Sequence, residues 1–121
     1  MKFNLAILSS IFLFGCANTP NDFSTEHHSA SKSIQLVKKG ETPDFKFNQI
    51  KKISSNSCDS KTAARVVGDE SEALLVLKLE AAKLGADAII NYSCWTSPVD
   101  LINNCWAAKK CEGNAVSILS K

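Results

Sequence analysis

The clearest hydrophobic pattern in the chain lies between residues 69 and 85 and predicts one amphipathic helix. The acidic and hydroxyl residues at 69–72 are typical of a helix N-terminus, and Gly85 is typical of a helix end. The apolar positions between them recur at helical spacing: Leu74, Leu77, Ala81 and Leu84. We therefore expect a helix over residues 71–84 that packs this stripe on a sheet and turns its other side to water.

Segments with strand-like composition lie on both sides of this helix. Apolar residues among polar ones at 45–53 indicate a first strand, and residues 88–95 and 106–118 indicate two more. A short run at 33–37 is a candidate edge strand. A chain of 121 residues provides for one small domain and no more. The expected fold is therefore α+β, a small three- to four-stranded sheet covered by one helix.

The first residues have the features of an export signal. Lys2 provides a positive start, and residues 5–14 form an apolar run that is too short to span a bilayer. The sequence Leu13-Phe14-Gly15-Cys16 then has the lipobox arrangement, in which a small residue precedes the cysteine that carries the diacylglycerol. We expect residues 1–15 to be removed as a lipoprotein signal peptide and Cys16 to be lipidated. An ordinary secretory signal with a chance cysteine is the alternative.

Residues 16–44 are expected to form the lipidated cysteine and a flexible tether. The stretch is rich in Ser, Thr, Asn, Pro and Lys and shows no sustained period of 2 or 3.6. Fully extended, a coil of this length reaches roughly 95 Å, which would let the domain work away from the membrane surface. His27 and His28 are expected to be solvated in this tether. The folded domain is then expected to span residues 45–121.

The cysteines predict disulfides. The chain has five, and lipidation of Cys16 leaves an even set: Cys58, Cys94, Cys105 and Cys111. A zinc site is the structural rival, but these residues form no C-x2-C pair and no histidine lies among them, so we expect no metal and no other cofactor. If residues 88–95 and 106–118 form a hairpin that turns near residues 102–103, Cys94 lies opposite Cys111. Cys105 is then left at the loop mouth to reach Cys58.

Charge and residue types narrow the function further. The formal net charge is +2, from 14 basic and 12 acidic residues, and the basic ones are scattered, so nucleic acid is not implied. The pairs Lys51-Lys52 and Lys109-Lys110 form either one basic patch or, as we expect, a solvated face. The two histidines lie in the predicted tether, and no C-x-x-C pair is present. We therefore expect neither hydrolysis nor thiol–disulfide exchange, and no enzyme.

Several segments of the chain form one recognisable set: residues 53–58, 80–90 and 92–94, the step from Cys105 to Cys111, and residues 114–118. Together they resemble the RcsF family, the outer-membrane stress-sensor lipoproteins of the Rcs envelope-stress phosphorelay. The helix–Gly-Ala-Asp-Ala–strand segment alone also looks like a wider group of small cytosolic domains. Four cysteines in this order behind a lipobox make the resemblance specific.

This resemblance implies the pairs Cys58–Cys105 and Cys94–Cys111. It also implies an outer-membrane lipoprotein that senses envelope stress and signals by contact with the inner-membrane repressor of the phosphorelay, with outer-membrane barrel proteins as further partners. The family's tether is longer and proline-rich, whereas this one holds only Pro20 and Pro43, which weakens the case for threading through a barrel. A periplasmic ligand- or metal-binding lipoprotein module without a signalling role is the alternative.

Overall fold

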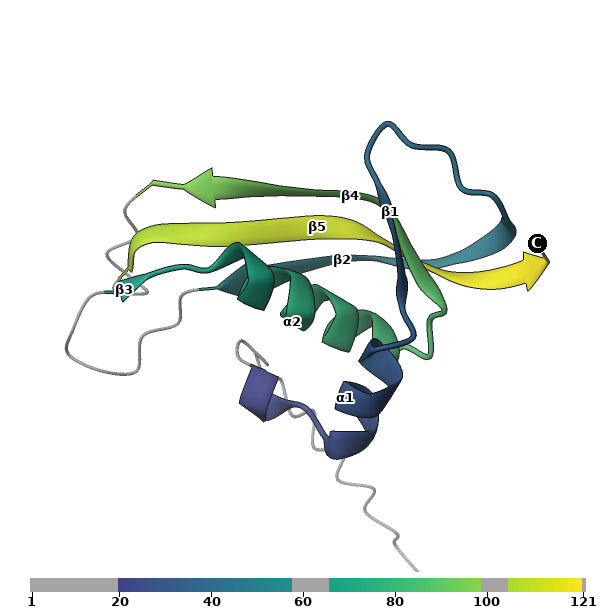
Figure 1. Cartoon of the computed structure of the whole chain (residues 1–121), viewed down its shortest axis with the longest axis horizontal. Helices are drawn as coiled ribbons and strands as arrows, with labels where there is room; N and C mark the ends of the chain where they lie inside the picture. Colours follow the sequence, from purple (N-terminus) through teal and green to yellow (C-terminus); the bar gives the residue numbers. More distant parts are fainter. Residues whose placement is uncertain (1–19, 58–65, 99–104, 121) are drawn as a thin grey trace, which may run out of the picture.

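The computed structural model describes residues 20–57, 66–98 and 105–120, so the predicted signal peptide, Cys16 and Cys58 lie outside the described residues. The described chain forms, in order, η1 (Pro20–Asp22), α1 (Thr25–Ser31), β1 (Gln35–Lys38), β2 (Lys46–Ser57), β3 (Val66–Val67), α2 (Glu70–Lys83), β4 (Ala88–Ser97) and β5 (Cys105–Ser120) (Figure 1). The predicted α+β class is confirmed, and no helix in these three ranges is long and apolar enough to cross a membrane.

The sheet has four strands in the order β1-β4-β5-β2, and the short β3 pairs parallel with the start of β5. The strands β2, β5 and β4 pair antiparallel, whereas β1 pairs parallel with β4, which makes the sheet mixed. The three strands expected from their composition are present, and the candidate edge strand at 33–37 corresponds to β1. The hairpin of β4 and β5 also has the predicted register, with Cys94 directly opposite Cys111.

Helix α2 forms where the pattern predicted it and covers one face of the sheet. The Asp69 side chain accepts a hydrogen bond from the Ser71 N–H at 2.9 Å and caps the N-terminus, and Gly85 follows the helix with a φ of 72°. Leu77 and Ala81 are fully buried, and Leu74 packs at the edge of the same core. Leu84 differs from the prediction: it is 37% exposed, because it occupies the C-cap position, where the chain turns away from the sheet.

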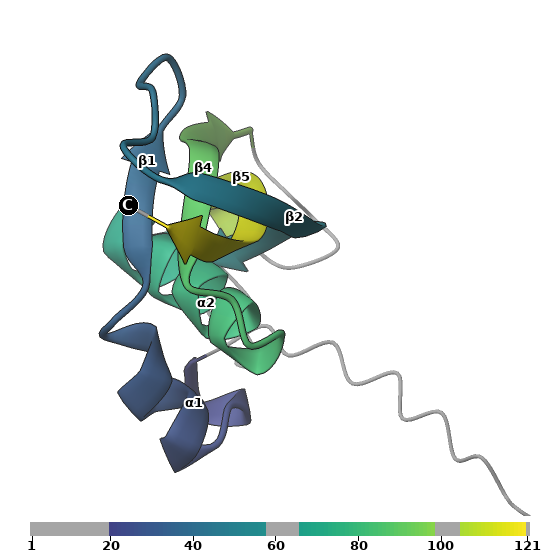
Figure 2. The same cartoon turned by 90° about the vertical axis from the view of Figure 1, so that its right-hand side faces the viewer.

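A second layer covers the outer side of α2, which the sequence led us to expect in water. Phe23, directly after η1, packs on Val76 and Leu79 of α2 in a small separate cluster, with Leu75 beside it. Helix α1 lies against α2 as well, so the described part of the chain has two stacked α-helices rather than the single predicted helix (Figure 2). The order of layers is therefore the sheet, then α2, then η1 with α1.

The described part of the predicted tether, residues 20–44, holds η1, α1 and β1. Ser24 caps α1 by accepting a hydrogen bond from the His27 N–H at 3.2 Å. The stretch has few large apolar residues. Phe23, Ile34 and Val37 are buried against surfaces that the rest of the chain supplies, and Leu36 is half-buried. The folded unit therefore begins well before the predicted boundary at residue 45.

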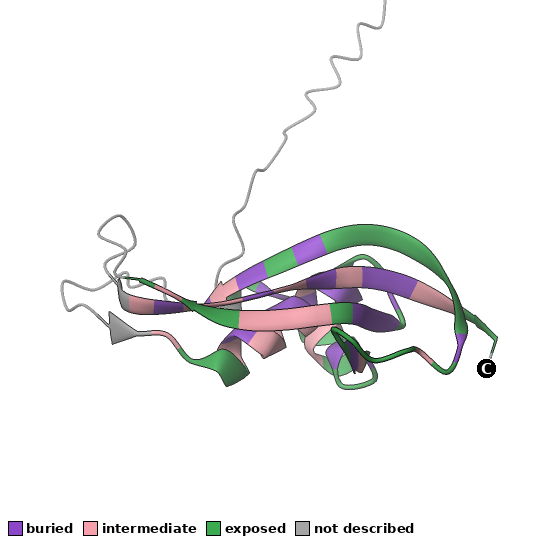
Figure 3. Ribbon diagram, turned by 90° about the horizontal axis from the view of Figure 1, so that it is seen from above, coloured by how far each residue is buried: buried purple, intermediate pink, exposed green. Residues whose placement is uncertain are grey.

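The face of the sheet that points away from α2 is covered at one end only. Phe45, from the segment between β1 and β2, is buried there with Val37 and with residues of β4 and β5: Ala88, Ile90 and Val116. The other end carries mostly exposed and half-buried residues (Figure 3). The first half of β2, which pairs with the last residues of β5, is exposed as well. A partly uncovered sheet face is thus a prominent feature of the fold.

Candidate interaction surface

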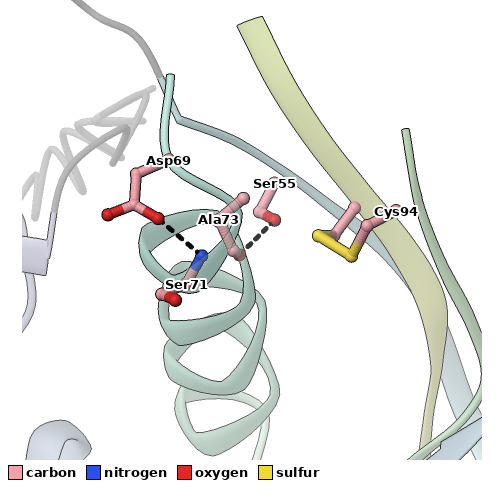
Figure 4. Close-up of a disulfide and its surroundings, with 6 residues drawn as sticks. Ser55, Asp69, Ser71, Ala73 and Cys94 are labelled. Atoms are coloured by element: carbon pink, nitrogen blue, oxygen red, sulfur yellow. Dashed lines mark hydrogen bonds between the residues drawn. A yellow bond between two sulfur atoms is a disulfide. The ribbon is translucent and has the colours of Figure 1, made fainter. Parts of the chain in front are cut away.

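The Cys94–Cys111 disulfide lies at the centre of the fold. Its sulfur atoms are 2.11 Å apart, and the two Cα atoms are 4.1 Å apart across the β4–β5 pair. Cys111 is fully buried in the core that also contains Leu77 and Ile89, and Cys94 is half-buried beside that core. The predicted pairing of these two cysteines is therefore confirmed, and the bond fixes the register of β4 against β5 under the start of α2 (Figure 4).

The predicted Cys58–Cys105 pair falls partly outside the described residues and stays a prediction. Cys58 is not described, and Cys105 is described only through its backbone at the start of β5. The preceding residue, Ser57, is the last residue of β2 and pairs with Lys109 of β5. The backbone thus brings the segments that lead to both cysteines to the same end of the sheet.

Two serines of the Ile-Ser-Ser-Asn-Ser-Cys segment tie this end of β2 to α2, a role that the sequence did not predict. The buried Ser55 hydroxyl donates a hydrogen bond to the Ala73 carbonyl (Figure 4). The buried Ser57 Oγ accepts one from the Asp69 N–H at 2.9 Å. Gly68 lies beside them, where a Cβ atom would come within 2.3 Å of the Ser57 carbonyl oxygen. The segment therefore holds the helix cap and the disulfide region in one rigid unit.

The uncovered part of the sheet, called the open face below, is built from three strands. Strand register and alternation place its members side by side: Lys52, Ser54 and Asn56 of β2, Lys110, Glu112 and Asn114 of β5, and Ser93 and Trp95 of β4. Trp95 is 44% exposed and lies in register with Lys110, which in turn faces Asn56. The open face therefore combines one large aromatic side chain with small polar and charged ones.

The lysine pairs do not form one basic patch: Lys51 and Lys52 are exposed, whereas Lys109 and Lys110 are half-buried. Lys52 is in register with Asn114, whereas Lys110 is in register with Asn56, so the two lysines are separated along the sheet. Glu112 lies between them and approaches the Lys52 Nζ at 3.8 Å, with both side chains exposed. Lys109 points to the other side, where its Nζ donates to the Thr96 hydroxyl. Charge on the open face is thus mixed, which suits a protein surface better than a polyanion.

A hollow at the opposite end of the molecule is the second feature that could hold a ligand. It encloses about 580 Å³ between α1, the start of β1 and the turn before β4, and is lined by Ala30, Ser33, Ile34, Gln35, Ala86, Asp87 and Ile118. The Asp87 carboxylate already accepts a hydrogen bond from the Ile118 N–H at 2.9 Å. Within the described ranges, no group of three or more His, Cys, Asp or Glu residues is arranged to hold a metal ion.

The predicted site residues thus have three outcomes. Cys94 and Cys111 are brought together, Cys105 is placed by its backbone, and Cys16 and Cys58 lie outside the described residues. The open face was not predicted, because its members are spread over three strands and become neighbours only through the pairing register.

In comparisons with known proteins, no protein-family model matches the chain and no curated protein matches it.

Proposed function

We propose that the chain is an outer-membrane lipoprotein of the RcsF type, which senses envelope stress and signals by direct contact with the inner-membrane repressor of the Rcs phosphorelay. The lipobox at Cys16 supports export and lipid anchoring. The disulfide supports an oxidising compartment such as the periplasm, because such bonds seldom persist in the cytosol. The periplasm is where a protein anchored in one membrane meets a receptor anchored in the other.

The observation that carries the proposal is the Cys94–Cys111 bond. The RcsF resemblance implies that the second and fourth cysteines of the domain pair with each other, and these are the second and fourth. A disulfide between consecutive cysteines, such as Cys105 with Cys111, would have been evidence against the resemblance to the family. Ser55 and Ser57, in the Ser-rich segment that the resemblance also includes, bond to α2 and its N-cap beside the same region.

The open face is the surface that we assign to the partner. An exposed tryptophan surrounded by small polar residues is typical of a protein-binding surface, where a few aromatic or arginine side chains supply most of the binding energy. Trp95 is on β4 beside the disulfide, so its backbone is held in place before a partner arrives. Preorganisation of this kind lowers the entropy cost of association.

Binding of the purified mature chain to the periplasmic domain of the phosphorelay repressor tests the proposal. Trp95→Ala should weaken binding by about 2 kcal/mol, a roughly thirty-fold rise in Kd. Leu119→Ala is the matched control, because Leu119 is a large exposed apolar residue at the far end of β5, outside the open face. No measurable binding of the unaltered chain would contradict the proposed function. Equal binding by the Trp95→Ala and Leu119→Ala variants would show that the open face is not the surface that binds the repressor.

A further inference from the structure

The first described element, η1, begins at Pro20, only four residues after the predicted lipidation site, Cys16. An extended chain advances at most about 3.6 Å per residue, so four steps span no more than about 14 Å. This inference rests on the lipid anchor of the proposed function. If Cys16 carries the lipid, Pro20 is held within that distance of the membrane surface. The domain therefore cannot extend as far from the membrane as an unfolded tether of 28 residues would allow.

The start of the folded chain is fixed to the body of the molecule. The ring of the half-buried His28 forms a hydrogen bond with the Pro20 carbonyl through Nε2 at 2.7 Å, and the Phe23 N–H donates to the same carbonyl at 3.3 Å. The Phe23 ring, 9% exposed, is inserted against Val76 and Leu79 of α2. Pulling on the anchor therefore acts on the outer layer of the molecule, formed by η1 and α1.

This outer layer and the open face lie on opposite sides of the molecule. Phe23 and α1 pack on the side of α2 that is turned away from the sheet, and the open face is the far side of that sheet (Figure 2). Packed layers are about 10 Å apart, so the open face lies about 20 Å beyond η1. A link of at most about 14 Å cannot carry the chain around a body of this thickness.

We propose that the η1–α1 layer faces the phospholipid headgroups of the leaflet that holds Cys16, and that the open face is thereby directed away from the membrane. The exposed side chains of the layer are small, polar or singly charged: Asp22, Ser24, Thr25, Glu26, Ser29, Ala30 and Lys32. They suit a hydrated headgroup region, and they offer neither a basic cluster nor an apolar ridge for binding lipid without an anchor. The acyl chains on Cys16, and not the side chains of the layer, therefore keep the layer at the membrane surface.

The orientation has a consequence for signalling. A domain held at its own membrane cannot extend across the periplasm, so the repressor's periplasmic domain must come to it. The open face, with Trp95 at its exposed end, is then the surface that meets a partner arriving from the opposite membrane. Here the partner approaches a domain that stays at its own membrane, whereas the family's longer tether extends the domain away from the membrane.

Energy transfer to labelled lipid tests the orientation on the full mature lipoprotein. The chain is reconstituted in vesicles of phosphatidylethanolamine and phosphatidylglycerol that carry a dansyl-labelled phosphatidylethanolamine. One variant keeps Trp95 as its sole donor (Trp106→Phe). The other places the donor on α1 (Glu26→Trp with Trp95→Phe and Trp106→Phe), and Ser29→Trp in the same background gives a second α1 donor. Glu26 and Ser29 are exposed, so both substitutions leave the packing intact.

Both α1 donors should transfer several-fold more energy to the headgroup dye than Trp95 does. A flexible Gly/Ser spacer inserted between Thr19 and Pro20 should erase the difference, because the link then exceeds the thickness of the molecule. Equal transfer without the spacer, or stronger transfer from Trp95, would overturn the orientation while leaving the lipid anchor in place. Failure of the unaltered chain to float with the vesicles would instead contradict the proposed function, and the orientation with it.

Discussion

Leu77 is one of the largest fully buried side chains and lies between α2 and the sheet. Leu77→Ala should lower the free energy of unfolding by about 2–5 kcal/mol, because it opens a cavity that a domain of this size closes poorly. The midpoint of urea unfolding measures the effect. Leu84→Ala is the matched control: Leu84 is 37% exposed, so its truncation should change stability by only about 0.5 kcal/mol. Equal losses from both variants would contradict the packing described.

These two leucines also show where residue-level prediction works. The helical spacing placed Leu74, Leu77 and Ala81 correctly, because a 3.6-residue period is set by the backbone of the helix itself. Leu84 belongs to the same period but falls at the C-cap, where the chain has already begun to turn through Gly85. The hydrophobic period of a helix does not by itself show at which turn its contact with the sheet ends.

At the scale of elements, the N-terminal layer is the part that sequence patterns did not reveal. The seven residues of α1 are mostly polar, and η1 is followed by a single large apolar residue, Phe23, so neither shows an amphipathic period. Their burial depends on Val76 and Leu79, which lie on the side of α2 that the pattern assigned to water. Tertiary contact, not local propensity, decides the structure of this segment.

The same layer should open independently of the sheet. Phe23→Ala removes the ring that fastens η1 to α2, so the amides of residues 23–31 should exchange with solvent deuterium much faster than in the unaltered chain. The amides of β5 should keep their protection, because their hydrogen bonds to β2 and β4 do not depend on Phe23. Hydrogen exchange read by mass spectrometry distinguishes the two segments. Loss of protection throughout the chain would show that the layer is part of one cooperative unit.

The β4–β5 hairpin owes its register to a disulfide that the sequence predicted by simple pairing arithmetic. Cys94 and Cys111 are 17 residues apart, and closing a loop of that size stabilises a fold by about 3 kcal/mol in the chain-entropy model. The free energy of unfolding of the double variant Cys94→Ala, Cys111→Ala should therefore be lower by about that amount, and its urea midpoint should fall accordingly. An unchanged midpoint would mean that the hairpin holds its register without the bond.

Peptide mapping under non-reducing conditions extends this test to the pair outside the described residues. We expect Cys58 joined to Cys105 alongside the Cys94–Cys111 bond. A peptide that joins Cys105 to Cys111, or Cys58 to Cys94, would contradict the observed register and the RcsF resemblance together.

At the scale of the whole molecule, the sequence predicted the α+β class, the Cys94–Cys111 pair and the hairpin of β4 with β5, because each follows from local period and pairing rules. The extent of the folded unit and the open face did not follow from such rules. Both depend on contacts between segments far apart in the chain, such as Phe23 with Leu79 and Trp95 with Lys110. The open face and the lipid anchor are the two features on which the proposed signalling role depends.

The measurement that tests this account most directly is the output of an Rcs phosphorelay reporter in cells that lack their own RcsF. The unaltered chain should raise reporter output when envelope stress is applied. Cys16→Ala should abolish the response, because the chain loses its anchor, and Cys58→Ser should abolish it while palmitate labelling of Cys16 persists. Reporter output that stays at background with the unaltered, lipidated chain present in the envelope would contradict the signalling role.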